Sequence, residues 1–297
     1  MLTATRSCVN LVGWRVPGCA IRSRVIPQLR AGLAQRVGAR AYGRRVSDVV
    51  KENPDAPAGA FEAEAAGLRW LAAAGARVAE VRDVSARRIV LERIEPAAPT
   101  ARAARDFGRS LATTHGAGAR AFGARPDGWD GPLFIGRLEQ PAAAETSWGA
   151  FYARDRVACF LERAVANGNL DRAGAEVVRE ACELVASGAL DDDEPPARIH
   201  GDLWNGNLLF SPEGAVLIDP AAHGGHRETD LAMLDLFGAP HLNEIVRGYE
   251  SVHPLRDGWR ERIPLHQLHP LAVHAVGHGP AYGRLLIDAA RATCALA

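Results

Sequence analysis

The sequence contains almost no lysine. Of its 35 basic side chains, 34 belong to arginine and only one, Lys51, belongs to lysine. Arginine presents a planar fork of donors whereas lysine carries a compact point charge, so the two do not replace each other at a functional site. A lysine retained in a chain that otherwise uses arginine is therefore informative. The alternative is a surface residue without a role.

Two further absences limit the class of protein. No apolar run reaches the roughly 18 residues that a membrane-spanning helix needs, so no membrane association is expected. The five cysteines are odd in number, scattered, and free of any Cys-x-x-Cys pair. This argues against a disulfide framework or a zinc site and favours the reducing cytoplasm. They are Cys8, Cys19, Cys159, Cys182 and Cys294.

Acidic residues are absent from positions 1–47, which hold nine arginines. The remaining 250 residues carry a net charge of −9, so nucleic-acid binding is not expected of them. Three interpretations of residues 1–47 stay open: a transit peptide or nucleic-acid arm, an atypical start of a small lobe, or sequence displaced by an upstream start or a frame error in a GC-rich gene. The lack of a helical period, with Pro17, Gly18 and Pro27, argues against the first.

One motif carries most of the chemical information. It is His200-Gly201-Asp202-Leu203-Trp204-Asn205-Gly206-Asn207, followed by Ile218-Asp219-Pro220. The same H-x-D-x-x-x-x-N spacing occurs in the catalytic loop of protein kinases. Asp202 can orient an incoming hydroxyl group, while Asn207 and Asp219 offer the oxygen ligands that Mg²⁺ prefers.

The motif has a simpler explanation, because turns are rich in Asp and Asn for backbone reasons. The His-Gly pair before Asp202 and the strand-borne Asp219 after it favour phosphoryl transfer instead. A transferred phosphoryl group spreads negative charge over its oxygens, so its catalysis depends on positioning and electrostatic stabilisation. We therefore expect a kinase that uses ATP and Mg²⁺.

Lys51 fits this expectation. A kinase needs a lysine on a small-lobe strand, paired with a helix glutamate, to hold the α and β phosphates of ATP. Lys51 follows Val49-Val50, and two glutamates, Glu62 and Glu64, come 11 and 13 residues later in a helix-like segment. Either glutamate has the spacing of the helix partner.

The hydrophobic pattern predicts an α+β fold with two lobes. A small β-rich lobe spans 48–95, with a helix at 60–76 and a strand at 88–94, and Glu92 lies at the hinge beside the adenine. A larger helical lobe spans 96–297. Helices are expected at 101–116, 147–167, 171–187, 230–237, 242–249, 264–276 and 281–295, strands at 198–199, 208–210 and 215–218, and a cleft-lining loop at 125–137.

Histidine is concentrated near the end of the chain. Eight of the ten histidines lie between His223 and His278, and His266/His269 and His274/His278 have helical spacings that suit a metal. No neighbouring cysteine or carboxylate completes such a site, so we interpret them as polar helix residues. Asp230, just before an apolar run, is expected to be a helix N-cap, and the alternative is a place in the cleft beside the metal.

Beyond the catalytic motif, several blocks closely resemble the fructosamine kinase (ketosamine-3-kinase) family, within the aminoglycoside phosphotransferase-like branch of the protein-kinase-like fold. The resemblance covers about residues 48–297. Its blocks are His200–Asn207, Ile218–Ala221, Gly225–Met233, Leu236–Gly238, Gly258–Arg262, Phe61–Leu71, Val90–Glu92, Phe107–His115, and Trp148 with Phe151, Tyr152 and Arg156.

The resemblance implies a role for each matching position. Asp202 is similar to the catalytic base, Asn207 and Asp219 to the magnesium ligands, Lys51 to the phosphate lysine, and Glu64, ahead of Glu62, to its partner. Such enzymes phosphorylate the 3-hydroxyl of small-molecule or protein-bound ketoamines, and the unstable 3-phosphate then eliminates and releases the amine. Bacterial relatives act more on ribulosamines and erythrulosamines than on fructosamines.

Three residues are candidates for the substrate side. Trp259 offers a large flat face for a sugar or amine, or packs between helices. His226 is expected beside the metal, and Trp204 under the catalytic loop or at the substrate.

The family's glycine-containing strand-turn-strand over the phosphates has no clear counterpart in residues 1–47. Two alternatives therefore stay open: a kinase of another amino alcohol or an aminoglycoside, and a nucleotide-binding protein with impaired catalysis.

Overall fold

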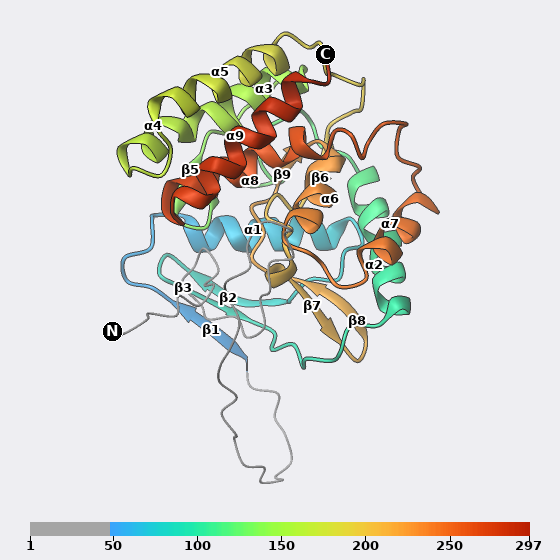
Figure 1. Cartoon of the computed structure of the whole chain (residues 1–297). Helices are drawn as coiled ribbons and strands as arrows, with labels where there is room; N and C mark the ends of the chain where they lie inside the picture. The colour runs from blue at the N-terminus through green and yellow to red at the C-terminus, as the bar shows by residue number, and fades with distance from the viewer. Residues whose placement is uncertain (1–47) are drawn as a thin grey trace, which may run out of the picture.

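The computed structural model describes residues 48–297, so the interpretations of residues 1–47 lie outside the described part. The predicted two-lobed α+β fold is confirmed. Its small lobe contains an antiparallel sheet of order β1-β3-β2 and helix α1 (Ala60–Ala73). The strands are β1 (Val49–Glu52), β2 (Val81–Ser85) and β3 (Arg88–Leu91). Figure 1 shows this sheet on one side of α1 and most of the helical lobe on the other.

Alternation in β1 decides which side chain faces the cleft. Val50 and Glu52 are exposed, whereas Lys51 between them is buried opposite Ile89 of β3. Successive residues of a strand point to opposite faces, so the register that exposes Val50 turns Lys51 inward. On α1, Phe61, Ala65, Leu68 and Leu71 form the buried stripe expected of an amphipathic helix.

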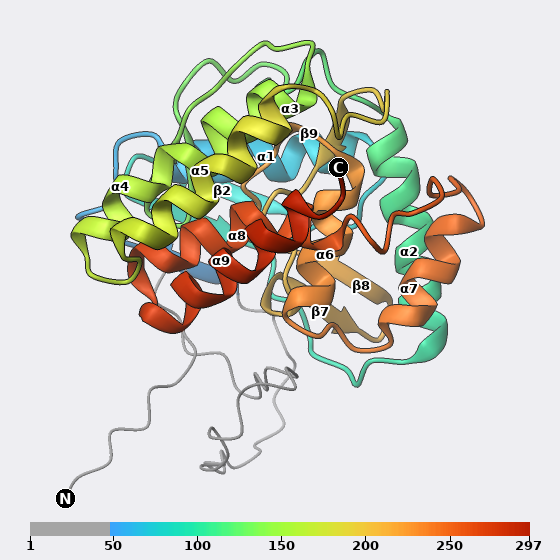
Figure 2. The same ribbon diagram turned by 45° about the horizontal axis from the view of Figure 1, so that its top comes forward.

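The larger lobe is mainly helical. Its helices are α2 (Ala101–Gly116), α3 (Trp148–Phe151), α4 (Cys159–Ala166), α5 (Arg172–Ala186), α6 (Arg227–Leu236), α7 (Leu242–Glu250), α8 (Ile263–Gly277) and α9 (Pro280–Cys294). One apolar core joins α4, α5, α8 and α9, and a second joins α2, α6 and α7. Figures 1 and 2 show α8 beside α9 and α2 beside α7.

Short strand pairs carry the loops of the site. They are β4 (Leu133–Ile135) with β5 (Leu138–Gln140), β6 (Ala197–Ile199) with β9 (His223–Gly225), and β7 (Leu208–Ser211) with β8 (Gly214–Leu217). The catalytic loop runs from the end of β6 to β7, and Asp219 follows β8. The expected cleft-lining loop at 125–137 in fact ends inside the β4–β5 hairpin.

The expected helix at 147–167 is interrupted. Between α3 and α4, Tyr152–Ala158 forms a π-helix, the type of bulge that accommodates one extra residue in a helix. Tyr152 from this segment lies against α8, where Pro270 has no N–H to donate to the carbonyl of His266. The Tyr152 hydroxyl lies 2.9 Å from that carbonyl and so replaces the missing donor.

No helix among residues 48–297 is long and apolar enough to cross a membrane.

Candidate active site

Lys51 lies between two carboxylates from different parts of the chain. Its Nζ donates to Glu64 Oε1 on α1 at 2.7 Å and also to Asp219 Oδ1 after β8. Burial alone disfavours the charged amine, but Asp219 and Glu64 outweigh it and raise the pKa of Lys51 above its ordinary value. The lysine is therefore a fixed positive charge that joins β1 and α1 of the small lobe to Asp219 of the larger lobe.

Glu64 is the glutamate that faces Lys51. Burial, with a contribution from Asp219, raises the pKa of Glu64 to about 7 although Lys51 acts in the opposite direction. Within residues 48–297, the other candidate, Glu62, makes no hydrogen bond or ion pair with Lys51, and its buried Oε2 has no hydrogen-bond partner. The spacing left both glutamates open, and the structure brings only Glu64 to the lysine.

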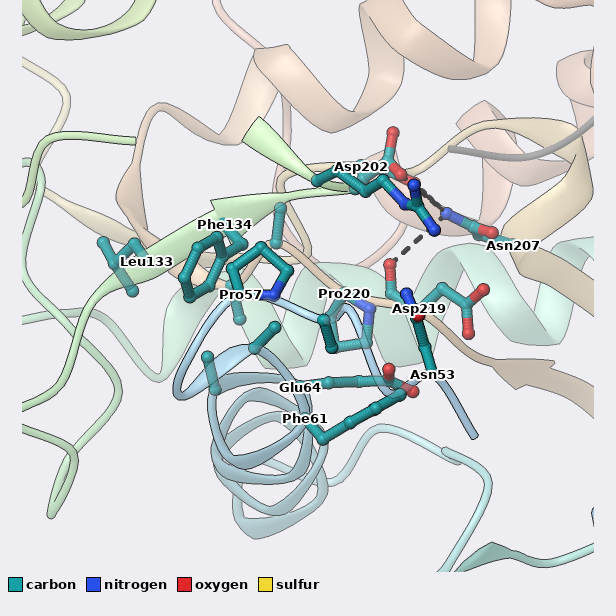
Figure 3. Close-up of a pocket in the computed structure, with 17 residues that line it drawn as sticks. Asn53, Pro57, Phe61, Glu64, Leu133, Phe134, Asp202, Asn207, Asp219 and Pro220 are labelled. Carbon is teal, nitrogen blue, oxygen red and sulfur yellow. Dashed lines mark hydrogen bonds between the residues drawn. The ribbon is translucent and has the colours of Figure 1, made fainter. Parts of the chain in front are cut away.

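The catalytic loop holds Asp202 and Asn207 together. Asn207 Nδ2 donates to Asp202 Oδ2 at 3.0 Å and to the Asp202 carbonyl at 2.8 Å. Residues Asn205–Asn207 form a short 3₁₀ turn, which brings the two side chains together across five positions of sequence. Figure 3 shows Asp202, Asn207 and Asp219 converging on one side of the pocket.

Two buried oxygens at this point have no hydrogen-bond partner in the described part of the chain. They are Asp202 Oδ1 and Asn207 Oδ1. Unsatisfied buried polar atoms are uncommon and often mark a place for a ligand or ion. Burial and the nearby Asp219 charge raise the pKa of Asp202 well above its ordinary value, as suits a general base that must exchange a proton near neutrality.

The donor set fits Mg²⁺. An amide oxygen of Asn207 and the carboxylate of Asp219 are hard oxygen ligands, and Asn207 Oδ1 has no partner within the described residues that would compete with a metal. Asp219 also has a left-handed backbone, with φ 54°. Such a conformation costs free energy in a residue other than glycine and is found disproportionately at functional sites.

A buried aspartate fixes the catalytic loop from behind. Asp230 accepts the backbone N–H of His200 at 2.8 Å and of Gly201 at 2.9 Å, and it lies 3.1 Å from His115 Nε2. Hydrogen bonds from His115 and the backbone outweigh burial and hold the pKa of Asp230 below its ordinary value. The loop therefore rests on an ionised carboxylate on α6.

The expected N-cap role of Asp230 is wrong. Helix α6 begins at Arg227, and His226 is its N-cap, accepting the N–H of Glu228. Asp230 lies in the first turn with its carboxylate turned toward the catalytic loop. The sequence pattern correctly indicated that Asp230 accepts backbone N–H groups. These groups belong to the catalytic loop and not to the first turn of α6.

Comparison with known proteins agrees with this geometry. A family model described as fructosamine kinase matches residues 38–291. The chain belongs to the fructosamine kinase family. It is 32% identical to a probable ketoamine kinase of Enterococcus faecium over 79% of this chain and 83% of that protein. A crystal structure from Thermobifida fusca, provisionally named a fructosamine-3-kinase, has 47% identity and a TM-score of 0.77, covering 83% and 85% of the two chains.

The fold extends to more distant phosphotransferases. Aminoglycoside phosphotransferase APH(4)-Ia has a TM-score of 0.50 at 17% identity, over 79% of this chain and 83% of that one. This likeness concerns the fold alone. Membership of the fructosamine kinase family makes the enzyme a phosphotransferase that acts on a hydroxyl group.

The predicted substrate residues lie away from the pocket that contains Asp202. Trp204 is buried against Met233 and Phe237 and covers Gly206 of the catalytic loop. Trp259 is buried with the Arg260 guanidinium 4.3 Å from its ring centroid. None of these side chains, nor His226, is among the residues that line the pocket. A substrate role for them stays a prediction.

Glu92 lies directly after β3, at the predicted hinge. Its side chain accepts from Arg77 at 3.2 Å and from the Glu80 backbone N–H at 3.3 Å. These contacts tie the end of β3 to the segment between α1 and β2, and Glu92 does not line the pocket around Asp202. The adenine-side role of Glu92 stays a prediction.

The end of the predicted cleft-lining loop at 125–137 does line this pocket, through Leu133, Phe134, Gly136 and Arg137. Sequence reasoning missed Asn53 and Pro57, which line the pocket from the loop after β1. Figure 3 shows Phe134 and Pro57 on the side of the pocket away from Asn207. That this wall is a hairpin was also missed, although Gly136-Arg137 between two short apolar runs is a hairpin signal.

Contrary to the expectation from the sequence, a carboxylate does lie near the clustered histidines. His226, Glu228 and His266 are buried with potential ligand atoms within 4.8 Å of one another. However, His226 Nδ1 accepts the Glu228 N–H, so a neutral His226 carries its proton on Nε2, which faces Asp192 at 3.1 Å. A protonated nitrogen cannot bind a metal, and Glu228 is already paired with Arg262 at 2.6 Å.

The two predicted metal-spaced pairs, His266/His269 and His274/His278, also take part in helix packing. His269 Nδ1 lies 2.7 Å from the Arg156 carbonyl, and His274 Nδ1 lies 2.7 Å from the Pro270 carbonyl. These contacts agree with the interpretation of polar helix residues.

Proposed function

We propose that the enzyme phosphorylates the 3-hydroxyl of ketoamines of the ribulosamine or fructosamine type, using ATP and Mg²⁺. The resulting ketoamine 3-phosphate eliminates and releases the amine, so the outcome is deglycation of a small molecule or a protein. One observation carries the proposal: Lys51, Glu64 and Asp219 form a buried ionic cluster beside Asp202 and Asn207. The relatives named ketoamine kinases supply the acceptor class.

Each residue has a defined part in this reaction. The buried Asp202 Oδ1, which has no partner among the described residues, accepts the proton of the sugar hydroxyl while the hydroxyl oxygen attacks the γ-phosphorus of ATP. The bond from that phosphorus to the bridging oxygen of ADP breaks at the same time. Asn207 keeps the Asp202 carboxylate oriented through the 3.0 Å hydrogen bond to Oδ2.

Lys51 and the metal ligands act on the nucleotide. Lys51 places its charge for the α and β phosphates, and Glu64 holds it in position at 2.7 Å. Asn207 Oδ1 and the Asp219 carboxylate would hold Mg²⁺, which neutralises negative charge on the phosphates. Lysine suits this position because it presents one compact charge to two partners.

A cytoplasmic location is part of the proposal. Cys159, Cys182 and Cys294 are all free thiols. Burial raises the pKa of the Cys182 thiol to about 12, so this cysteine stays protonated at neutral pH. Unpaired cysteines agree with a reducing compartment.

The test is ADP release by purified protein with Mg-ATP and a panel of acceptors. We expect turnover with ribulosamine, erythrulosamine or fructosamine, ³¹P spectra that assign the product as a 3-phosphate, and weak or no turnover with choline and aminoglycosides. Asp202→Asn should lower kcat by several orders of magnitude. The control is Asp288→Asn, an exposed change on α9 at a residue whose only ion pair among residues 48–297 is with Arg291.

Two results would contradict the proposal. One is a folded, Mg-ATP-binding protein that turns over none of the ketoamines. The other is turnover of an aminoglycoside or choline at a higher kcat/KM than any ketoamine, which would assign the enzyme to another acceptor.

A further inference from the structure

The hairpin of β4 and β5 places one arginine at a defined point of the cleft. Ile135 pairs with Leu138, so Gly136 and Arg137 form a two-residue loop, and Gly136 has φ 57°. Glycine at the first position of such a loop suits the tight turns that match strand twist. The turn leaves Arg137 little freedom of backbone position.

The hairpin is anchored on both strands. Leu133 and Ile135 of β4 and Gln140 of β5 are buried. Directly after β5, the carbonyl of Pro141 accepts a hydrogen bond from Arg156 Nη1 at 2.8 Å, and Arg156 is fully buried. The arginine at the tip therefore stands on a fixed support.

Arg137 lines the same pocket as Asp202, Asn207 and Asp219. The other ionisable residues of the pocket wall, Glu64 among them, are carboxylates, and each already has a partner. Glu64 and Asp219 share Lys51, and Asp202 Oδ2 accepts from Asn207. Arg137 itself is exposed and makes no hydrogen bond or ion pair with residues 48–297.

An exposed arginine without a partner is ordinary on an open surface. Here the guanidinium shares a pocket with three carboxylates and pairs with none of them, so its donors stay available to something that enters. The pocket has a volume of about 70 Å³. By the same measure one water needs about 10–15 Å³, so the space admits a group larger than a single water.

We propose that Arg137 is a catalytic residue that donates hydrogen bonds to the oxygens of the phosphoryl group during its transfer. The proposal rests on the proposed kinase reaction and adds to it a cation from the acceptor side of the cleft. Lys51 and the metal ligands act from the nucleotide side. Arg137 stabilises the negative charge that develops on the equatorial oxygens of the phosphoryl group. Arginines that act in this way in other phosphoryl-transfer enzymes contribute about 10³–10⁵ in kcat.

The planar fork matters to this role. Two parallel N–H donors match two oxygens of a phosphoryl group, whereas a lysine offers a single point charge. We therefore expect Arg137→Lys to recover only part of the rate lost in Arg137→Ala.

The chain provides a matched control. Arg87 is also exposed and lies in the two-residue turn between β2 and β3. Its backbone carbonyl accepts the Asn53 N–H at 3.0 Å, and its side chain has no hydrogen bond or ion pair with the described residues. Arg87→Ala removes an arginine from the same kind of turn without touching the pocket.

The first measurement is steady-state kinetics on both variants and the native protein. Arg137→Ala should lower kcat by about 10²–10³-fold while the KM for ATP changes less than about threefold, and Arg87→Ala should match the native protein. Equal kcat in Arg137→Ala and Arg87→Ala would overturn the proposal. So would an effect confined to the KM of acceptors that carry a carboxylate, because Arg137 would then recognise the acceptor.

The second measurement does not depend on turnover of a ketoamine. Mg-ADP with aluminium fluoride imitates the planar phosphoryl group in transfer, and its affinity is compared with that of Mg-ADP alone. Arg137→Ala should lose at least about tenfold in affinity for the fluoride complex and none for Mg-ADP. If native protein binds the fluoride complex tightly but turns over no ketoamine, the proposed acceptor fails while Arg137 is still tested. If Arg137→Ala binds the fluoride complex as well as native protein does, the role of Arg137 fails alone.

Discussion

Replacing Asp230 by asparagine tests whether the catalytic loop depends on a charge behind it. The two carboxylate oxygens have separate partners: Oδ2 accepts the N–H of His200 and faces His115, and Oδ1 accepts the N–H of Gly201. Asparagine has one acceptor oxygen and one NH₂ group. In either orientation, one buried backbone N–H then faces another donor.

The cost follows from these contacts. A buried donor left without an acceptor costs about 1–3 kcal/mol, and loss of a charged acceptor adds to it, so we expect the free energy of unfolding to fall by about 2–4 kcal/mol. For a domain of this size that lowers Tm by roughly 4–16 °C. Because the pKa of Asp230 is depressed, its contribution is present above the ordinary carboxyl pKa near 3.9 and is lost as pH falls through the folded value.

The assay is urea unfolding at pH 7 combined with hydrogen exchange of the His200 and Gly201 amides, which should exchange faster in the variant. Asp235→Asn is the control, because Asp235 lies on the same helix, is exposed, and has Gln267 as its only side-chain hydrogen-bond partner between residues 48 and 297. It should change stability by less than about 0.5 kcal/mol. If Asp230→Asn is as stable as this control and both amides stay protected, the loop does not rest on Asp230.

Three other predictions follow from burial and close packing. Burial lowers the pKa of His266 and His274 to about 4 and that of His269 to about 3. As pH falls from 6.5 to 4, the unfolded chain therefore binds protons that the folded protein does not. The free energy of unfolding should fall over this range by up to about 1.4 kcal/mol per pH unit per histidine. A urea midpoint that stays constant over the same range would contradict this prediction. A Cβ on Gly108 of α2 would overlap the Ile245 carbonyl oxygen, so Gly108→Ala should lower the free energy of unfolding in urea by about 1–3 kcal/mol. Gly116→Ala is the control, because its Cβ would have no atom closer than 4.0 Å and the free energy of unfolding should not fall. Because burial and Asp219 raise the pKa of Asp202, kcat/KM should fall as pH drops below neutrality, and a constant kcat/KM down to pH 5 would refute its role as base.

The parts of the site that follow from local spacing were predictable from the sequence. Asp202 and Asn207 are five residues apart in one loop, so their contact needs only a short turn. Lys51 and Glu64 lie on consecutive elements, β1 and α1, and their 13-residue separation bridges one connection. The helix at 101–116 was predicted to the residue, since Thr100 caps it and Pro99 precedes it.

Long-range relations were not predictable in the same way. Strand β9 pairs with β6 across more than twenty residues, and no local pattern in His223–Gly225 marks a strand. Asp230 has the composition of a cap, but whose N–H groups it satisfies depends on how α6 packs on the catalytic loop. The interruption at Tyr152–Ala158 likewise depends on contact with α8, because the apolar pattern there reads as one continuous helix.

Binding of nucleotide must rearrange the ionic cluster at Lys51. As described, Lys51 is shared by Glu64 and Asp219, so two carboxylates compete for one buried amine and burial raises the pKa of Glu64 to about 7. In the proposed reaction Asp219 turns to Mg²⁺ and Lys51 to the phosphates, which leaves Glu64 as the lysine's only carboxylate partner. The phosphates then replace Asp219 as the second anion beside Lys51, so ion-pair geometry within the small lobe becomes coupled to occupancy of the cleft.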